Sequence, residues 1–209
     1  MIWLSNKLEF PPHKEATKDG VLALGGDLSL ERLLLAYKNG IFPWYSEGEP
    51  IVWYAPSDRM LLFPEDLKVS KSMRKVINKN DFTITENKAF EAVIFNCKMI
   101  SRKDEFGTWI TDDMQQAYIN LHKKGFAKSI EVWQHKELVG GLYGVDLGNG
   151  VFCGESMFSK VSNVSKLAFI HLVNNCGYKF IDCQVYNDHL ASLGAKEVSR
   201  EYFLELLKN

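Results

Sequence analysis

The sequence lacks the features that mark several large classes of protein. Its four cysteines form no CxxC pair and lie inside apolar runs, which indicates buried, reduced thiols rather than a disulfide framework. It has no HExxH motif and no His/Cys pairing at zinc-ligand spacing, so we expect no metal and no cofactor. No apolar run approaches the roughly 20 residues of a membrane span, and no signal-like basic and apolar stretch begins the chain. These absences predict a cytoplasmic protein.

An excess of charge of one sign is also missing, since the sequence has 25 Lys and Arg residues and 26 Asp and Glu residues. A generic nucleic-acid binder is therefore not expected, and any basic surface must be local. Residues 68–80 are the local exception, because this stretch carries basic side chains and no acid. On a helix they form a stripe at i, i+3, i+4 and i+8: Lys71, Arg74, Lys75 and Lys79. The stripe predicts a phosphate-binding surface, with a chance basic face as the alternative.

The sequence pattern changes near residue 60. The 209 residues are enough for one large or two small domains. The first region is rich in proline and aromatic residues and contains one clear helix, capped by Ser29 and ended by Gly40. Large rings there lie on backbone that prolines interrupt, in "GIFPWYSEGEPIVWYAP". We predict a small N-terminal domain over residues 1–60 and a larger domain over residues 61–209.

The second region alternates short strands with amphipathic helices. Three successive strands are predicted at 129–133, 138–145 and 151–158, and a glycine-rich turn favours antiparallel hairpins. A mostly apolar helix at 163–176 then leads to another strand at 179–184. Antiparallel strands that run into a strand–helix–strand unit predict a mixed sheet in an α/β (α+β) fold.

Two polar residues interrupt the last of these strands, "FIDCQ". Strict alternation places Asp182 and Gln184 on one side and Ile181 and Cys183 on the other. Two polar groups on an apolar central strand are costly unless they line a cavity, and ligands gather near the carboxyl ends of parallel strands. The alternative is a buried network that caps the following helix. In that helix His189 is a candidate general base, although a lone His in a first helical turn is more often structural.

An acid also lies inside an apolar strand, "VFCGESMF". Alternation places Glu155 and Met157 on one face, and a bulge at Gly154 would shift that count by one. A carboxyl group surrounded by apolar side chains needs a partner or must change its pKa. Glu155 is therefore either a functional carboxyl group or one that a structural Arg or Lys satisfies.

Five motifs, in order, resemble one family. They are "LALGGDLSLERLLLAYKNGIFPWY", "GTWI", "LVGGLYGV", "FCGESMFS" and "IDCQVYNDHLASLGA". Together they are similar to bacterial leucyl/phenylalanyl-tRNA–protein transferases, from about Phe10 to the end of the chain. The resemblance implies an N-terminal domain followed by a domain similar to the acyl-CoA N-acyltransferases. It implies transfer of Leu or Phe, and less well Met, from aminoacyl-tRNA to proteins that begin with Arg or Lys, which marks them for degradation.

The resemblance also implies binding sites for the donor. Trp44 and Trp109 line the adenosine site, where an unpaired base can stack on an aromatic ring. An apolar pocket holds the Leu or Phe side chain, and the basic stripe contacts the tRNA backbone. The pocket residues are Leu142, Phe152, Met157 and Ile181.

The implied chemistry is aminolysis of an ester, which requires no nucleophilic Ser or Cys. By resemblance, Asp182 polarises Gln184, and we favour Gln184 as a group that orients the attacking amine rather than as a base. Glu155 suits the cationic side chain of the acceptor's first residue.

Two other classes of protein remain as alternatives. An acyl-CoA-dependent N-acyltransferase usually cradles pyrophosphate with glycine-rich backbone, whereas the corresponding segment here, "SKVSNVSKLAF", has no glycine. A non-catalytic RNA-binding module would use the basic stripe and the Trp residues, but it leaves Glu155, Asp182 and Gln184 without a role.

Overall fold

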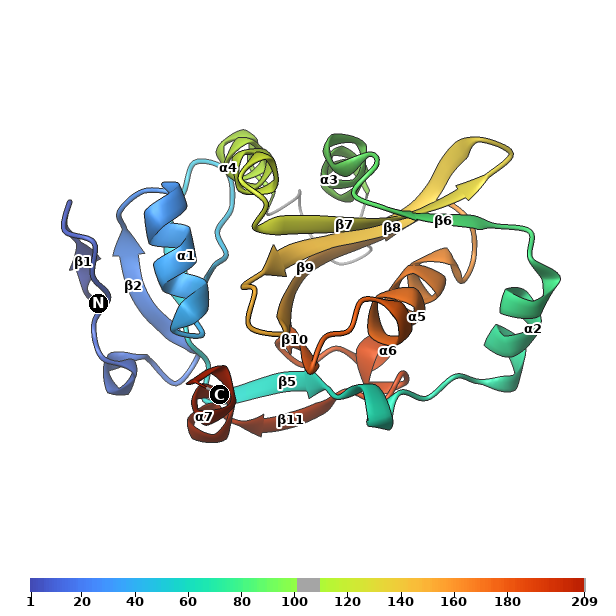
Figure 1. Cartoon of the computed structure of the whole chain (residues 1–209). Coiled ribbons are helices and arrows are strands. Elements are labelled where there is room, and N and C mark those ends of the chain that lie inside the picture. Colours follow the sequence, from blue (N-terminus) through green and yellow to red (C-terminus); the bar gives the residue numbers. More distant parts are fainter. Residues whose placement is uncertain (101–109, 209) are drawn as a thin grey trace.

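The computed structural model describes residues 1–100 and 110–208, arranged as two sheets with helices packed on them (Figure 1). The N-terminal part is a four-stranded sheet in the order β1-β2-β4-β3. Its strands are β1 (Trp3–Leu4), β2 (Val21–Gly25), β3 (Phe42–Pro43) and β4 (Val52–Tyr54). One helix, α1 (Leu30–Lys38), lies beside it, and a 3-10 turn, η1 (His13–Glu15), precedes β2.

The predicted first helix is confirmed. The Ser29 hydroxyl accepts a hydrogen bond from the Arg32 N–H at 3.4 Å, and Gly40 follows the helix with φ +67°. A Cβ on Gly40 would lie 2.7 Å from the Phe203 ring, so glycine satisfies both the left-handed backbone and the close approach.

The large sheet has seven strands in the order β11-β5-β10-β9-β8-β7-β6. Its strands are β5 (Asp58–Leu62), β6 (Thr83–Glu86), β7 (Ala127–Gln134), β8 (Glu137–Asp146), β9 (Val151–Ser159), β10 (Phe180–Gln184) and β11 (Lys196–Ser199). The β9–β10 pair is parallel, whereas the hairpins β7–β8 and β8–β9 are antiparallel. The predicted mixed sheet is therefore confirmed. The predicted domain boundary at residue 60 falls inside β5, and the division itself stays a prediction.

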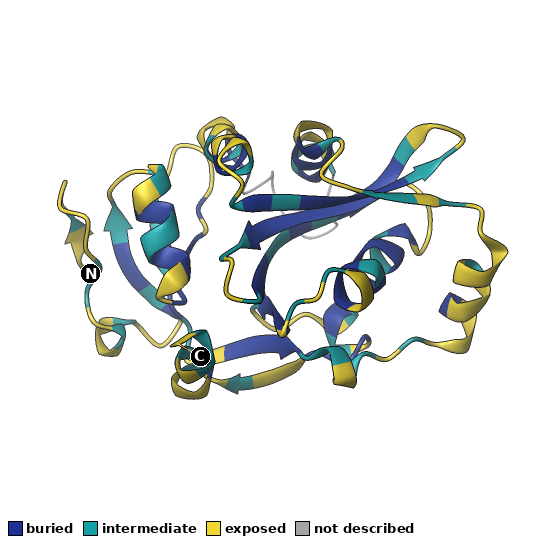
Figure 2. Cartoon of the chain, in the orientation of Figure 1, coloured by how far each residue is buried: buried dark blue, intermediate teal, exposed yellow. Residues whose placement is uncertain are grey.

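Helices cover both faces of the large sheet. The helices of this part of the chain are α2 (Lys71–Lys79), α3 (Phe90–Met99), α4 (Asp112–Lys123), α5 (Val164–Asn175), α6 (Asp188–Ala191) and α7 (Arg200–Lys208), with a 3-10 turn, η2 (Pro64–Asp66). Figure 1 shows α3 and α4 on one face and α5 on the other. Two buried apolar clusters follow from this arrangement, and Figure 2 shows the buried strands between the helix layers. Within the described residues, no helix is long and apolar enough to cross a membrane.

Candidate active site

A cleft opens where the two parallel strands separate. β9 and β10 pair from Phe180 with Val151 to Asp182 with Cys153, and β9 then continues to Ser159. Beyond the last pair lies a cleft of about 590 Å³. This is the carboxyl end of both parallel strands, the place where the sequence predicts a ligand site.

The cleft brings together most of the residues that the sequence singles out. Those that line it are Trp44, Leu142, Phe152, Glu155, Met157, Ile181, Gln184 and His189. Trp109 lies outside the described residues. Asp182 is fully buried behind the cleft and faces Arg59. The roles assigned to these residues stay predictions, but their convergence supplies an apolar pocket whose wall carries the polar side chains of Glu155, Gln184 and His189.

Glu155 reaches the cleft through a bulge in β9. Tyr143 pairs with Ser156 and Gly144 pairs with Gly154, so Glu155 is an extra residue opposite β8. A Cβ on Gly144 would lie 2.2 Å from the Cys153 carbonyl oxygen. Because glycine has no Cβ, the two strands can approach closely beside the bulge. The predicted bulge shifts the alternation as expected and turns the Glu155 side chain toward α4 and β10.

A second bulge lies in β10 and corrects the alternation expected for "FIDCQ". Against β5, Asp182 pairs with Leu61 and Gln184 pairs with Met60, so Cys183 is the extra residue. Gln184 has a φ of 65°, in the left-handed region that non-glycine residues seldom adopt. As a result Gln184 lines the cleft together with Cys183, whereas Asp182 points to the opposite side. Strained backbone of this kind is typical of functional sites.

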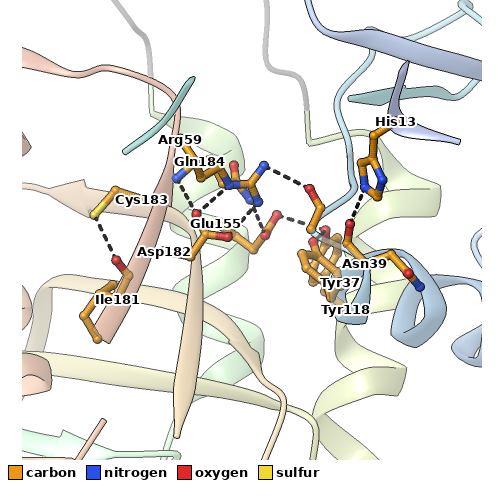
Figure 3. Close-up of polar contacts among 11 residues, drawn as sticks. His13, Tyr37, Asn39, Arg59, Tyr118, Glu155, Ile181, Asp182, Cys183 and Gln184 are labelled. Atoms are coloured by element: carbon orange, nitrogen blue, oxygen red, sulfur yellow. Dashed lines mark hydrogen bonds and ion pairs between the residues drawn. The ribbon is translucent and has the colours of Figure 1, made fainter. Parts of the chain in front are cut away.

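Asp182 is held by a buried arginine that the sequence analysis did not single out. Arg59 Nε and Nη2 donate hydrogen bonds to the two Asp182 oxygens at 2.8 and 2.6 Å (Figure 3). The Arg59 guanidinium also lies 4.7 Å from the centroids of the Phe42 and Phe203 rings. Asp182 contacts Gln184 through the Gln184 backbone N–H, at 2.9 Å. The contact is thus to the backbone N–H and not to the side-chain amide of Gln184, which direct polarisation by Asp182 would require.

Glu155 is the partner of the Gln184 side chain. Its Oε1 accepts a hydrogen bond from Gln184 Nε2 at 2.8 Å, and its Oε2 accepts one from the Tyr118 hydroxyl at 2.9 Å. The Tyr118 hydroxyl also bonds to that of Tyr37, so a chain of hydrogen bonds runs from α1 through α4 to the cleft (Figure 3). Neither of the sequence-based interpretations of Glu155 included these tyrosines, which lie at positions that the helical pattern assigns to the core.

Burial raises the pKa of Glu155 to about 7. The hydrogen bonds from Tyr37 and Tyr118 act in the opposite direction, and the charge of Asp182 adds to the rise. Among the described residues that line the cleft, Glu155 is the only acid. The site therefore holds one carboxyl group that titrates near neutral pH, which suits it for proton transfer.

The helix after β10 has its own cap, so the capping interpretation of Asp182 and Gln184 is wrong. Asn187 Oδ1 accepts a hydrogen bond from the Leu190 N–H at 3.2 Å, at the start of α6. His189 lines the cleft, and its buried Nε2 has no hydrogen-bond partner among the described residues. Burial, with a contribution from Lys166, lowers the pKa of His189 and favours the neutral ring.

The predicted adenine-stacking residue Trp44 lies at the cleft, whereas the predicted basic stripe does not line it. Trp44 is on its rim, 38% exposed, with its ring centroid 5.8 Å from that of Tyr54. The basic stripe lies on α2, at the end of the molecule away from the N-terminal sheet (Figure 1). Ser70 caps α2, and all four basic side chains are exposed, with Lys79 paired to Asp81 at 2.5 Å.

Comparison with known proteins gives one consistent result. A family model described as "Leucyl/phenylalanyl-tRNA protein transferase" matches residues 61–208, and the model of its N-terminal domain matches residues 26–57. The chain is 59% identical to a leucyl/phenylalanyl-tRNA–protein transferase of Flavobacterium johnsoniae and 58% identical to that of Flavobacterium psychrophilum. Both matches cover 100% of this chain and 100% of the relative.

Solved structures share the fold at low identity. FemX superposes with a TM-score of 0.50 at 10% identity, over 86% of this chain and 71% of that one. A conserved protein of unknown function from Bacteroides thetaiotaomicron gives a TM-score of 0.50 at 13% identity, over 66% of this chain and 55% of that one. These likenesses agree with the acyltransferase-like fold expected from the sequence and say nothing further about activity.

Proposed function

The chain belongs to the leucyl/phenylalanyl-tRNA protein transferase family, and from this membership we propose that it transfers Leu or Phe from aminoacyl-tRNA to proteins with N-terminal Arg or Lys. Met is a weaker donor amino acid in this proposal. The observation that carries it is the cleft, in which an apolar wall adjoins the hydrogen-bonded pair Glu155 and Gln184. Aminoacyl-tRNA is a cytoplasmic substrate, so the reaction and the degradation that it promotes take place there.

The apolar wall is the proposed pocket for the transferred side chain. Leu142 pairs with Met157 across β8 and β9, and Phe152 pairs with Ile181 across β9 and β10. Leu and Phe differ in shape, and the flexible thioether chain of Met157 can adapt to both. Trp44 at the rim supplies a ring on which the terminal adenine can stack.

Glu155 is the proposed proton acceptor for the reaction. The neutral α-amine of the acceptor attacks the ester carbonyl carbon, the amine proton passes to the Glu155 carboxylate, and the bond from that carbon to the ribose oxygen breaks. The proton then leaves with that oxygen as a hydroxyl. Asp182 is already saturated by Arg59, and a neutral amide such as Gln184 is a very poor base. Gln184 orients the amine and Glu155 takes its proton.

Glu155 also supports the choice of a cationic acceptor. It is the only acid among the described residues that line the cleft, where Lys and Arg are absent from the same set. A carboxylate in a partly desolvated cleft attracts the side chain of an N-terminal Arg or Lys more than a neutral one.

The α5 N-terminus disfavours the acyl-CoA alternative. The Ser159 hydroxyl accepts a hydrogen bond from the Ser165 N–H at 3.0 Å, so part of the amide cluster that would receive pyrophosphate is occupied.

A transfer assay decides between the candidates. Purified protein is mixed with Leu-tRNA or Phe-tRNA and a peptide that begins with Arg, and in parallel with acetyl-CoA and the same peptide. Product from acetyl-CoA alone, or tRNA binding without transfer, would overturn the proposal.

A further inference from the structure

Three side chains that bind transition metals come together where β6 meets the end of α5. Glu86 is the last residue of β6, His171 lies in α5, and Cys176 directly follows that helix. A carboxylate oxygen, a ring nitrogen and the thiol sulfur lie within 4.8 Å of one another. All three residues are outside the set that lines the cleft, so this cluster is separate from the proposed reaction.

We propose that Glu86, His171 and Cys176 bind a divalent transition metal ion, with zinc as the best fit. Thiolate, imidazole and carboxylate are all zinc ligands, at metal–ligand distances of about 2.0–2.3 Å. The ligand atoms of a tetrahedral site then lie roughly 3–4 Å apart, slightly less than the largest present separation of up to 4.8 Å. Three protein ligands leave the fourth position to water.

The charges of the three ligands match this ion. A carboxylate and a thiolate carry two negative charges, a neutral imidazole carries none, and a divalent cation balances them. Binding displaces the thiol proton to solvent, as it does at other thiolate sites. No oxidation or reduction accompanies this step.

One ring nitrogen of His171, Nε2, faces the other proposed ligands. Its Nε2 lies 2.9 Å from Glu86 Oε1, and its Nδ1 lies 3.0 Å from Asn175 Nδ2. Rotation of the Asn175 amide by half a turn places its oxygen against Nδ1. Nδ1 then carries the proton and donates it to the amide oxygen, which leaves the Nε2 lone pair for the metal.

This site differs from the sequence-based expectation of no metal. Glu86 and His171 are 85 residues apart, and only the contact between β6 and α5 joins them. The pattern of His and Cys along the chain therefore contains no usable signal. Because α5 also lines the cleft through Phe169 and Leu172, the ion would fix the end of a helix that supports the active site.

Titration of the metal-free full-length protein with Zn²⁺ and Co²⁺ tests the proposal. We expect one equivalent of each ion to bind, and cobalt to give a thiolate charge-transfer band with tetrahedral d–d bands. At a free zinc concentration of one hundred times Kd, Tm should rise by about 5–10 °C. Cys176→Ser should remove the charge-transfer band. Glu86→Gln and His171→Asn should weaken binding by more than the roughly 10–100-fold that removal of an outer hydrogen-bond partner costs.

Matched controls separate this site from adventitious binding. His135→Asn changes an exposed histidine on the β7–β8 turn, and Cys97→Ala changes a buried thiol of α3. Both should bind zinc as the wild-type protein does. Melting curves in the presence of a chelator establish that each variant is folded. Absence of saturable binding by the folded wild-type protein, or an unchanged cobalt spectrum in Cys176→Ser, would overturn the site.

Discussion

Arg59 and Asp182 form a bidentate ion pair that joins β5 to β10 in the interior of the protein. Their side chains are 2% and 0% exposed. The same Asp182 carboxylate accepts the backbone N–H of Gln184, directly after the bulge that turns Gln184 into the cleft. We therefore propose that Asp182 acts on the reaction through position, because it holds the strained backbone from which the Gln184 side chain reaches Glu155.

Asp182→Asn should destabilise the protein and slow turnover together. The amide cannot accept from both Arg59 nitrogens and the Gln184 N–H, and a broken buried ion pair typically costs about 3–5 kcal/mol. We expect a decrease of that size in the free energy of unfolding, measured with urea, and a lower kcat with nearly unchanged KM for aminoacyl-tRNA. Asp66→Asn, which breaks an exposed pair with Lys196, should cost no more than about 1 kcal/mol. Wild-type stability and turnover in Asp182→Asn would refute the positional role.

The pH dependence of transfer should report Glu155. With a pKa near 7 its carboxyl loses its proton as pH rises through 7, and the acceptor α-amine loses its own at about 7.7–8.0. At acceptor concentrations well below KM, the wild-type rate should therefore rise with pH through both deprotonations, that of Glu155 and that of the α-amine. Glu155→Gln should lower kcat/KM by about 10²–10⁴-fold. Its pH profile should keep only the rise in rate that comes from deprotonation of the acceptor α-amine. A variant profile that keeps the inflection near 7 would assign it to another group.

Glu155→Gln should lower activity but raise the stability of the folded protein near neutral pH. The folded-state pKa of Glu155 is above its unfolded value near 4.5, so the folded protein binds the extra proton between pH 4.5 and 7. Wild-type stability contributed by this group is thus lost as pH rises through that window. Glu155→Gln, which stays neutral, should gain in Tm relative to the wild type between pH 5 and pH 8. An unchanged Tm difference across this range would mean that Glu155 is well solvated.

The sequence predicted those parts of the fold that depend on local patterns. The cap of α1 at Ser29 could be predicted because a hydroxyl side chain before an apolar helical period is a local sequence signal. The polar residues in two apolar strands were also visible, since a buried polar group is costly wherever it lies. These signals located Glu155 and Gln184 before their contacts were known.

The geometry of the site depends on pairing between strands, which no local pattern contains. The β10 bulge appears only when Gln184 is aligned with Met60, so simple alternation placed Gln184 on the face of Asp182 rather than on the face that lines the cleft. Arg59 lies 123 residues before Asp182, and Tyr118 lies 37 residues before Glu155. At the level of sequence these residues are a basic side chain at a strand start and an aromatic residue on a helix face.

Removal of the basic stripe should weaken tRNA binding without changing amino-acid preference. Arg74 and Lys75 are exposed on α2, so replacing both with Ala should raise KM for Leu-tRNA and Phe-tRNA by similar factors. The log–log salt dependence should flatten by roughly 0.7–0.9 for each phosphate that the protein no longer neutralises. Lys14 and Lys18, exposed in the N-terminal part, form a control pair of similar charge whose replacement should leave the slope unchanged. Equal slopes in both double variants would remove α2 from the interface.

Met157→Ala should change the choice between Leu and Phe. Met157 lies opposite Leu142 in the wall of the cleft, so truncation widens the pocket at its adaptable side. A Leu side chain is too small to fill the widened pocket, whereas the larger Phe ring occupies part of the new space; the kcat/KM ratio of Phe-tRNA to Leu-tRNA should therefore rise. Since a methylene-sized change in an apolar pocket is worth about 1–3 kcal/mol, the ratio should rise by roughly tenfold or more. Met99→Ala removes an exposed methionine at the end of α3 and should leave the ratio unchanged. Equal decreases for both donors in Met157→Ala would place the aminoacyl side chain outside this pocket, because a wall that does not touch the substrate cannot discriminate between two substrates.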